Sequence, residues 1–276
     1  MGKIVWLASY PKSGNTWLRA FLANIIADTD TPVPFSEYWR YATNEASGHW
    51  YKPRLGGTIK ARHLHQVAQL RLAVQQDIAD AKANHSLVKT HSLFGSVFGH
   101  PQINVGVTAA AIYMVRNPLD VAISFAKHND TSIDAAITSM AQASTRSTMR
   151  TDRVFEWIGD WSGHVASWTA GDNPNILVIR YEDTLADPRH AFHRVVSFLK
   201  IQTSREQFDR ALEFSSFDRL QKMEQETGFE EKPDGADAFF RVGRMDQWRE
   251  VLTAEQVARV VARHREQMQR FDYVPD

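Results

Sequence analysis

The sequence has no cysteine, no excess charge of either sign and no long apolar run, and each absence excludes a class of protein. Without cysteine there are no disulfides, thiolate metal sites or cysteine nucleophiles. The 276 residues carry 32 Lys plus Arg and 32 Asp plus Glu, so the net charge is zero. A protein that binds a bulk polyanion usually has a basic excess, so we expect no nucleic-acid partner. No apolar run approaches the ~20 residues that span a bilayer, so we expect no membrane span.

The same absences favour a cytoplasmic protein. The apolar segment 4–8 is too short for the core of a secretory signal and is followed by Pro11-Lys12. A chain without cysteine is compatible with a reducing compartment. The length suits one large domain or two small ones. Because no linker is evident, we expect one domain over residues 1–276.

Short apolar runs alternate with helical patterns along the chain. Runs rich in Ile, Val and Leu predict buried strands at residues 3–8, 86–89, 110–115 and 175–180. The patterns predict helices at 18–27, 67–83, 119–127, 153–169, 188–199, 205–214 and 254–269. This alternation predicts an α/β fold, with a central parallel sheet flanked by helices. Ligands bind such sheets at the carboxyl ends of the strands.

The turn after the first predicted strand reads Tyr-Pro-Lys-Ser-Gly-Asn-Thr-Trp at residues 10–17. Backbone N–H groups at such a helix start form an anion cradle, and Gly14 allows close approach of a phosphate. Lys12 adds a charge, while Ser13 and Thr16 add hydroxyl donors. The alternative is a capped helix with a surface lysine. The Walker pattern is absent, which disfavours an ordinary ATPase or GTPase.

This turn resembles the 5′-phosphosulfate loop of the sulfotransferases that use 3′-phosphoadenosine 5′-phosphosulfate (PAPS). Many cytosolic members have Thr where this chain has Asn15, and bacterial members, including those that sulfate glycopeptide antibiotics, look similar to this variant. The resemblance implies a P-loop-like sulfotransferase fold. It also implies that Lys12 and the backbone of Ser13, Gly14, Asn15 and Thr16 hold the 5′-phosphosulfate, and that Trp17 stacks on the adenine.

A second motif follows the third predicted strand, where Arg116-Asn117-Pro118 precedes Asp120 and Ser124. Arginine offers a bidentate fork for phosphate. Asp120 could orient the arginine or cap the helix, and a purely structural Arg–Asp pair is the alternative. The motif is similar to the family's 3′-phosphate motif, which implies 3′-phosphate contacts for Arg116 and Ser124.

Lys89-Thr90-His91 ends the second predicted strand. A histidine there could act as a general base, because its ordinary pKa lies close to neutrality. The segment is similar to the one that carries the catalytic histidine in cytosolic sulfotransferases. The resemblance implies that His91 is the base on the acceptor hydroxyl and that Lys89 stabilises the transferring sulfonyl group. A histidine base favours a phenol or alcohol acceptor of small or medium size.

The C-terminal third contains weaker matches. Tyr181, Ser215 and Phe217 lie in segments that are similar to family elements around the adenine. Residues 241–248 look like the segment that closes over the 3′-phosphate, which implies contacts from Arg241 and Gly243. Val242 replaces the family's lysine, and Arg244 could supply the missing charge.

The acceptor side carries the least specific signals. The aromatic-dense stretch 35–51 has few helix signals and could line an acceptor pocket with Phe35, Tyr38, Trp39, Trp50 and Tyr51. The alternative is that these rings only cover the sheet. The acidic segment 228–238 could be a lid over the site.

Together these patterns predict a sulfotransferase that transfers a sulfonyl group from PAPS to an acceptor hydroxyl and releases adenosine 3′,5′-bisphosphate (PAP). No paired carboxylates or histidine spacing suggest a metal. The alternatives are an ATP-dependent kinase and a non-catalytic nucleotide-binding protein. The oligomeric state is open, with a homodimer as one option. The pocket should be positive, with balancing acids elsewhere, including Glu230, Glu231, Asp234 and Asp237 of the lid segment.

Overall fold

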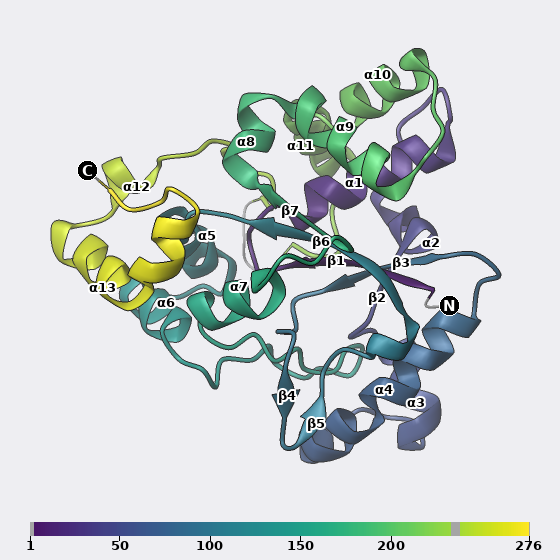
Figure 1. The fold of residues 1–276 in the computed structure, drawn as a ribbon, viewed down its shortest axis with the longest axis horizontal. Helices are drawn as coiled ribbons and strands as arrows, with labels where there is room; N and C mark the ends of the chain where they lie inside the picture. Colours follow the sequence, from purple (N-terminus) through teal and green to yellow (C-terminus); the bar gives the residue numbers. More distant parts are fainter. Residues whose placement is uncertain (1–2, 233–237, 276) are drawn as a thin grey trace.

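The computed structural model describes residues 3–232 and 238–275, and its centre is a five-stranded parallel sheet (Figure 1). The strand order is β2-β3-β1-β6-β7. The strands are β1 (Ile4–Ser9), β2 (Ala42–Asn44), β3 (Ser86–Thr90), β6 (Thr108–Val115) and β7 (Ile176–Arg180). A two-stranded antiparallel hairpin, β4 (Ser96–Val97) with β5 (His100–Pro101), stands apart from this sheet. The predicted α/β fold with a central parallel sheet is confirmed.

Helices cover both faces of the sheet (Figure 1). Neighbouring side chains of a strand point to opposite faces. Ile4 and Trp6 of β1 pack in one apolar cluster with α4, α7 and α13, whereas Val5 and Leu7 pack in another with α1, α9 and α10. Burial on both faces explains why β1 is a continuous apolar run. The helices are α1 (Asn15–Ala27), α2 (Tyr38–Tyr41), α3 (Gly48–Leu55), α4 (Leu64–Asp80), α5 (Pro118–His128), α6 (Ile133–Met140), α7 (Trp161–Thr169), α8 (Tyr181–Ala186), α9 (Pro188–Leu199), α10 (Arg205–Phe214), α11 (Phe217–Thr227), α12 (Trp248–Val251) and α13 (Ala254–Arg270).

The register brings the predicted site segments to one edge of the sheet. Ala8 of β1 lies opposite Thr90 of β3 on one side and Tyr113 of β6 on the other. After the central strand β1, the chain first forms β2 and β3 on one side of β1 and then β6 and β7 on the other side. Such a reversal leaves a crevice at the carboxyl ends of the strands. The turns after β1, β3, β6 and β7 therefore open onto the same crevice.

All four predicted strands are present, whereas the predicted helix 153–169 is wrong in its first half. The helix α7 begins only at Trp161, because Gly159 has a φ of 71° and Asp160 caps the helix by accepting the N–H of Gly163. Residues 153–158 form no helix; Arg153 forms an antiparallel bridge with Ser47, and Trp157 forms one with Arg146. The stretch 35–51 has few helix signals in its sequence, yet it contains α2 and the start of α3.

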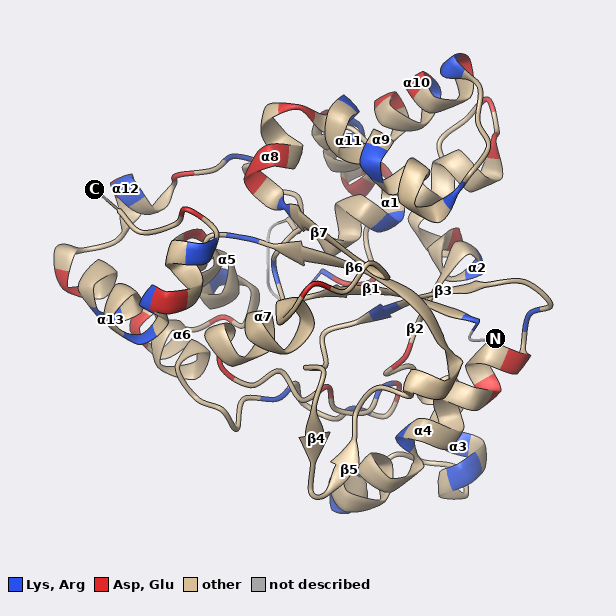
Figure 2. Ribbon diagram, viewed as in Figure 1, with Lys and Arg blue, Asp and Glu red and all other residues tan. Residues whose placement is uncertain are grey.

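Charged residues are spread over the outer helices. Both signs are intermingled on helices such as α10 and α13 (Figure 2). Within the described ranges, no helix combines the length and the apolar character that a membrane span would need.

Candidate active site

A cavity of about 900 Å³ lies at the carboxyl edge of the sheet. Thirteen of the sixteen predicted site residues line it. They are Lys12, Gly14, Asn15, Thr16, Trp17, Lys89, His91, Arg116, Ser124, Tyr181, Phe217, Arg241 and Gly243. Ser13, Ser215 and Arg244 are not part of the lining. The structure therefore brings together residues from the turns after four strands and from the late segment 241–243.

The turn between β1 and α1 is built to present backbone N–H groups. Gly14 caps α1 with a φ of 98°, and no side chain caps the helix. The amide of Asn15 ties the turn to β1 by donating to the Leu7 carbonyl at 2.8 Å. A Cβ on Gly14 would lie only 2.8 Å from the Tyr181 ring. Because the first N–H groups of a helix have no partner within it, this end of α1 suits an anion.

Arg116 joins this turn to the late segment of the chain. Its guanidinium donates to the Lys12 carbonyl at 3.1 Å and to the Arg244 carbonyl at 3.4 Å. The same group lies over the Tyr181 ring, 4.2 Å from the ring centroid. Its buried Nε has no hydrogen-bond partner among the described residues. Arg116 is thus held in place while keeping a donor for a ligand.

His91 is oriented by the end of β1. Its Nδ1 donates to the Ser9 carbonyl at 2.8 Å. Because a carbonyl only accepts, Nδ1 carries the proton, and Nε2 carries the lone pair. Burial and the positive charge of Lys89 lower the pKa of His91 to about 3. The imidazole is therefore neutral at pH 7, as a general base must be.

Glu156 connects Lys89 with His91. One carboxylate oxygen accepts the backbone N–H of His91 at 2.7 Å, and the other lies 3.4 Å from the Lys89 Nζ. Burial alone would raise the pKa of Glu156, but Lys89 and His91 outweigh it and lower the pKa to about 2. Glu156 is thus an anion that fixes Lys89 beside His91.

Lys12 lines the cavity from the turn after the central strand β1. Its Nζ lies 3.4 Å from Nδ1 of His128 and 4.0 Å from the centroid of the Phe239 ring. Burial lowers the pKa of Lys12 to about 8, against the opposing effect of Glu231. The ammonium is therefore still mostly charged at pH 7.

Asp120 also holds the segment 241–248 in place. The two carboxylate oxygens of Asp120 accept the N–H groups of Asp246 and Trp248, at 2.8 and 3.0 Å. Sequence reasoning left open whether Asp120 orients Arg116 or caps α5; the structure shows that Asn117 is the cap. Gly243 has a φ of 60°, and a Cβ there would lie 2.5 Å from the Phe217 ring.

The comparison with protein families identifies the chain. The model of the sulfotransferase domain matches residues 3–272. The chain belongs to the sulfotransferase family. It is therefore a sulfotransferase enzyme, as the resemblance predicted, and the match covers all the segments that form the cavity.

Curated relatives of this sulfotransferase cover most of its length. It is 23% identical over 278 residues to an amine sulfotransferase of Oryctolagus cuniculus, an alignment that covers 97% of this chain and 81% of the relative. It is 25% identical over 274 residues to sulfotransferase 1E1 of Homo sapiens, covering 90% and 77%.

Solved structures share the fold. A retinol dehydratase in complex with retinol and PAP has a TM-score of 0.66 and 20% identity, covering 98% of this chain and 82% of that chain. The mouse sulfotransferase SULT7A1 complexed with PAP has a TM-score of 0.61 and 19% identity, covering 99% and 90%. These similarities confirm the predicted P-loop-like sulfotransferase fold.

Three predicted cofactor residues of the sulfotransferase lie outside the cavity lining. The Ser215 side chain is fully buried and donates to the Ala211 carbonyl at the end of α10. The Arg244 guanidinium pairs with Glu250, 2.5 Å away. The Arg244 guanidinium thus has an acidic partner in its own segment, and its contact with the 3′-phosphate stays a prediction. Ser13 is fully buried, and its Oγ has no hydrogen-bond partner among the described residues.

The aromatic residues expected at the acceptor pocket do not line the described cavity. Phe35 and Tyr38 pack in an apolar cluster with Phe240, and Tyr51 is fully buried in the main core. Trp39 is 67% exposed. Trp50 packs against the main core. The alternative, that these rings cover the sheet, applies to Trp50 and Tyr51, which α3 carries onto the cluster that includes strand residues. It does not apply to the exposed Trp39, and a contact of these rings with the acceptor stays a prediction.

The acidic segment 228–238 is only partly described, and residues 233–237, with Asp234 and Asp237, lie outside the described residues. Glu230 and Glu231 line the cavity, so the expectation that these acids lie away from the pocket is wrong. Glu231 pairs with the buried Arg19 of α1 at 2.7 Å. The pairing of Arg19 with Glu231 was not predicted from the sequence, because each looks like an ordinary surface charge.

Glu156 and His128 were also missed. Glu156 lies in the segment that was predicted as helix, where its carboxylate had no evident partner. His128 was one of eleven histidines, without a strand end to mark it. Its position at the end of α5, two turns beyond the arginine motif, was the one available signal.

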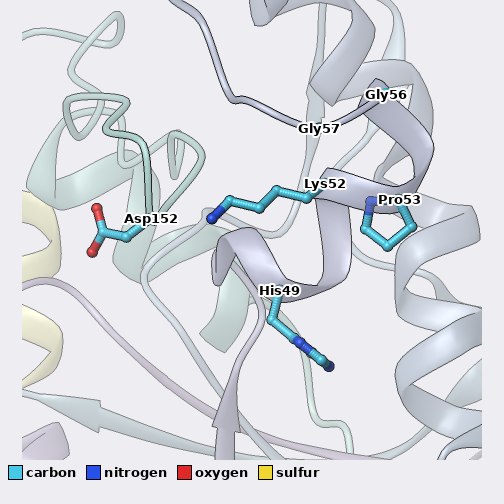
Figure 3. A pocket seen from close by; sticks show the side chains of 6 residues that line it. All are labelled: His49, Lys52, Pro53, Gly56, Gly57 and Asp152. Carbon is cyan, nitrogen blue, oxygen red and sulfur yellow. The ribbon is translucent and has the colours of Figure 1, made fainter.

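The described cavity is positive, as predicted, since nine Lys and Arg but only five Asp and Glu line it. Among the described residues, no group of His, Asp or Glu is arranged to hold a metal ion. A second hollow of about 700 Å³ lies beside α3 (Figure 3). It is lined by His49, Lys52, Pro53, Gly56, Gly57 and Asp152, and no predicted site residue faces it.

Proposed function

We propose that this sulfotransferase transfers the sulfonyl group of PAPS to the hydroxyl of a phenol or alcohol, with His91 as the base. The observation that carries the proposal is the orientation of His91. Its Nδ1–H is committed to the Ser9 carbonyl, so the lone pair of Nε2 is available beside the Lys89 ammonium.

The cavity fits the predicted donor. PAPS carries anionic groups at its 5′ and 3′ ends, and the cavity offers unused donors at two places. One is the start of α1 around Gly14, and the other is the buried Nε of Arg116, which lacks a partner among the described residues. Trp17 and Tyr181, whose rings form a T-shaped contact with centroids 6.1 Å apart, supply an apolar wall for the adenine.

The topology separates the two ends of the cavity. Arg116 and Tyr181 follow β6 and β7, on one side of β1. On the other side, Lys89 lies near the end of β3 and His91 follows that strand. We therefore place the nucleotide over β6 and β7 and the acceptor over β3 and β2. Lys12, after the central strand, then lies between them.

When bound, PAPS supplies the sulfonyl group and departs as PAP. The residues of this chain handle the charges and one proton. His91 accepts the proton of the acceptor hydroxyl at Nε2, and the Ser9 carbonyl stabilises the imidazolium through Nδ1–H. Lys12 neutralises the charge that develops on the leaving phosphate oxygen, and Lys89 faces the sulfonyl oxygens. The process relies on positioning and electrostatics, as phosphoryl transfer does.

Arg116 provides the test of the nucleotide end. Calorimetry should find that PAP binds more tightly than ATP, because PAP carries a 3′-phosphate that this site can bind and ATP does not. Replacing Arg116 with Ala should weaken PAP binding by about tenfold or more, since a charge-assisted hydrogen bond contributes about 1.5–3 kcal/mol. Arg205→Ala, on the exposed start of α10, is the matched control. Tighter binding of ATP would contradict a 3′-phosphate site, and an unchanged affinity for PAP in Arg116→Ala would contradict the role of Arg116 in it.

The other predictions stay proposals. We propose a cytoplasmic location, a single domain over residues 1–276, and a relationship to bacterial members that act on glycopeptides. The solved structures give one example of an alcohol as ligand, since the retinol dehydratase was solved with retinol and PAP. A panel of phenols and alcohols with labelled PAPS tests the acceptor class.

A further inference from the structure

The segment 146–158 forms the wall of the acceptor end of the cavity. Its Glu156 accepts the His91 N–H, and the N–H of Val154 donates to the Ala46 carbonyl just after β2. Ser147 and Glu156 hold the two halves of the segment together, because the Glu156 N–H donates to the Ser147 Oγ at 2.8 Å. The segment therefore lies over β2 and β3, away from the nucleotide end.

This wall is basic on the side that faces the cavity. Arg146, Arg150 and Arg153 all line the cavity, together with the hydroxyl residues Ser147 and Thr148. The stretch has two acids: Glu156 lines the cavity and is paired with Lys89, whereas Asp152 lines the second hollow. There the side chain of Lys52 extends towards it (Figure 3). The segment thus presents three arginines to the cavity beside the already paired Glu156, and its second carboxylate, Asp152, lies at the other hollow.

Two of these arginines have no close ion pair with a described residue. Arg146 has no ion-pair partner among residues 3–232 and 238–275, and its guanidinium rests 5.9 Å from the centroid of the Trp157 ring. Arg153 has only a loose pairing, with its Nε 3.6 Å from Asp152. That Nε is buried and makes no hydrogen bond to a described residue. Arg150 also lies 3.9 Å from Asp152, so one carboxylate serves two guanidinium groups.

The reacting groups do not account for these arginines. Lys89 is already paired with Glu156, and Lys12 lies beside His128 after the central strand. A phenol or alcohol that carries no charge would leave the arginines facing an apolar or neutral molecule. Arginine is suited to carboxylate and phosphate groups because its planar fork binds them in a bidentate way.

We propose that the acceptor carries an anionic group, such as a carboxylate, which Arg146 and Arg153 bind while its hydroxyl lies at His91. This inference rests on the proposed function for the hydroxyl and adds a subsite for the remainder of the acceptor. The subsite selects organic acids with a hydroxyl group over neutral and cationic acceptors of the same size. Both arginines are partly exposed to solvent, so the selection should weaken as salt is added.

The test compares three phenols that differ in charge: para-hydroxyphenylpropionate, its amide and tyramine. Calorimetry with PAP present should find that the carboxylate binds about three- to tenfold more tightly than the amide, with tyramine weakest. In the double variant Arg146→Gln with Arg153→Gln, the difference between carboxylate and amide should largely disappear. Arg205→Gln, an arginine whose side chain is 85% exposed at the start of α10, should leave it unchanged.

Each result separates the subsite from the activity. Equal binding of the three phenols, or preference for tyramine, overturns the anionic subsite even if all three accept labelled sulfonyl groups. A double variant that weakens PAP binding overturns it too, because the arginines would then belong to the nucleotide end. A carboxylate preference that depends on both arginines supports the subsite even if no phenol is sulfonated, in which case the proposed hydroxyl transfer fails instead.

Discussion

Replacement of Glu156 by Gln removes one charge from the centre of the site and keeps its shape. The Gln carbonyl can still accept the His91 N–H, but the Lys89 ammonium loses its anionic partner. The side chains of Lys89 and Glu156 are each only 8% exposed. Removing one partner of a buried pair costs about 3–5 kcal/mol, and the cavity lets water reach Lys89, so we expect about 2–3 kcal/mol.

The pKa of Glu156 gives a second route to the same figure. A pKa lowered from 4.5 to about 2 corresponds to about 3 kcal/mol of stability. Because the folded pKa is the lower one, this contribution is complete above pH 4.5 and is lost as the pH falls towards 2. The free energy of unfolding that the variant loses should therefore reach its full value at pH 7 and be smaller at pH 3.

The assay is urea unfolding followed by tryptophan fluorescence, with Glu250→Gln as the control. Glu250 pairs with Arg244, but its side chain is 63% exposed. An exposed pair contributes about 0–1 kcal/mol, so this variant should lose much less stability. Equal losses in the two variants would refute the reasoning, because they would show that burial of the Lys89–Glu156 pair has no energetic consequence.

Two further variants test the nucleotide cradle and the support of the base. Gly14→Ala places a Cβ 2.8 Å from the Tyr181 ring at a φ of 98°, so thermal unfolding should show a loss of about 1–2 kcal/mol, and calorimetry a weaker PAP affinity; unchanged values would contradict the cradle. His164 donates its Nε2–H to the His91 carbonyl and accepts from the Tyr113 hydroxyl, and burial lowers the pKa of His164 to about 4. Its contribution is complete above pH 6.5 and is lost as the pH falls to 4, so in His164→Gln the unfolding free energy should fall less steeply there, by about 1.4 kcal/mol per pH unit. An unchanged slope would show that His164 is protonated in the folded protein.

The sheet was predictable because its strands are buried on both faces. Residues 4–8 and 110–115 are continuous apolar runs, and helices pack on each side of them. The three-residue strand β2 gave no such signal, since it lies at the edge and pairs only with β3. The false helix at 153–160 arose because apolar residues there pack on the core without helical geometry.

The site was predictable where residues lie directly after strands. His91 and Arg116 fall there, and parallel strands bring their carboxyl ends together. Residues that act through tertiary contacts were not predictable. Glu156 pairs with Lys89, which is 67 residues away in the sequence, and Glu231 pairs with Arg19, which is 212 residues away. No local pattern specifies such pairs, because each partner is an ordinary charged residue in its own segment.

The role of His91 is tested most directly by the rate of sulfonyl transfer from labelled PAPS in His91→Ala. The exposed His190→Ala on α9 serves as the control, and the acceptor is the hydroxyl compound of the panel that the unaltered enzyme turns over fastest. The account predicts a loss of roughly 10²–10⁴ in rate for His91→Ala, with PAP binding unchanged by calorimetry. Near-normal turnover in His91→Ala would contradict the account, because the proton of the acceptor would then leave by another route.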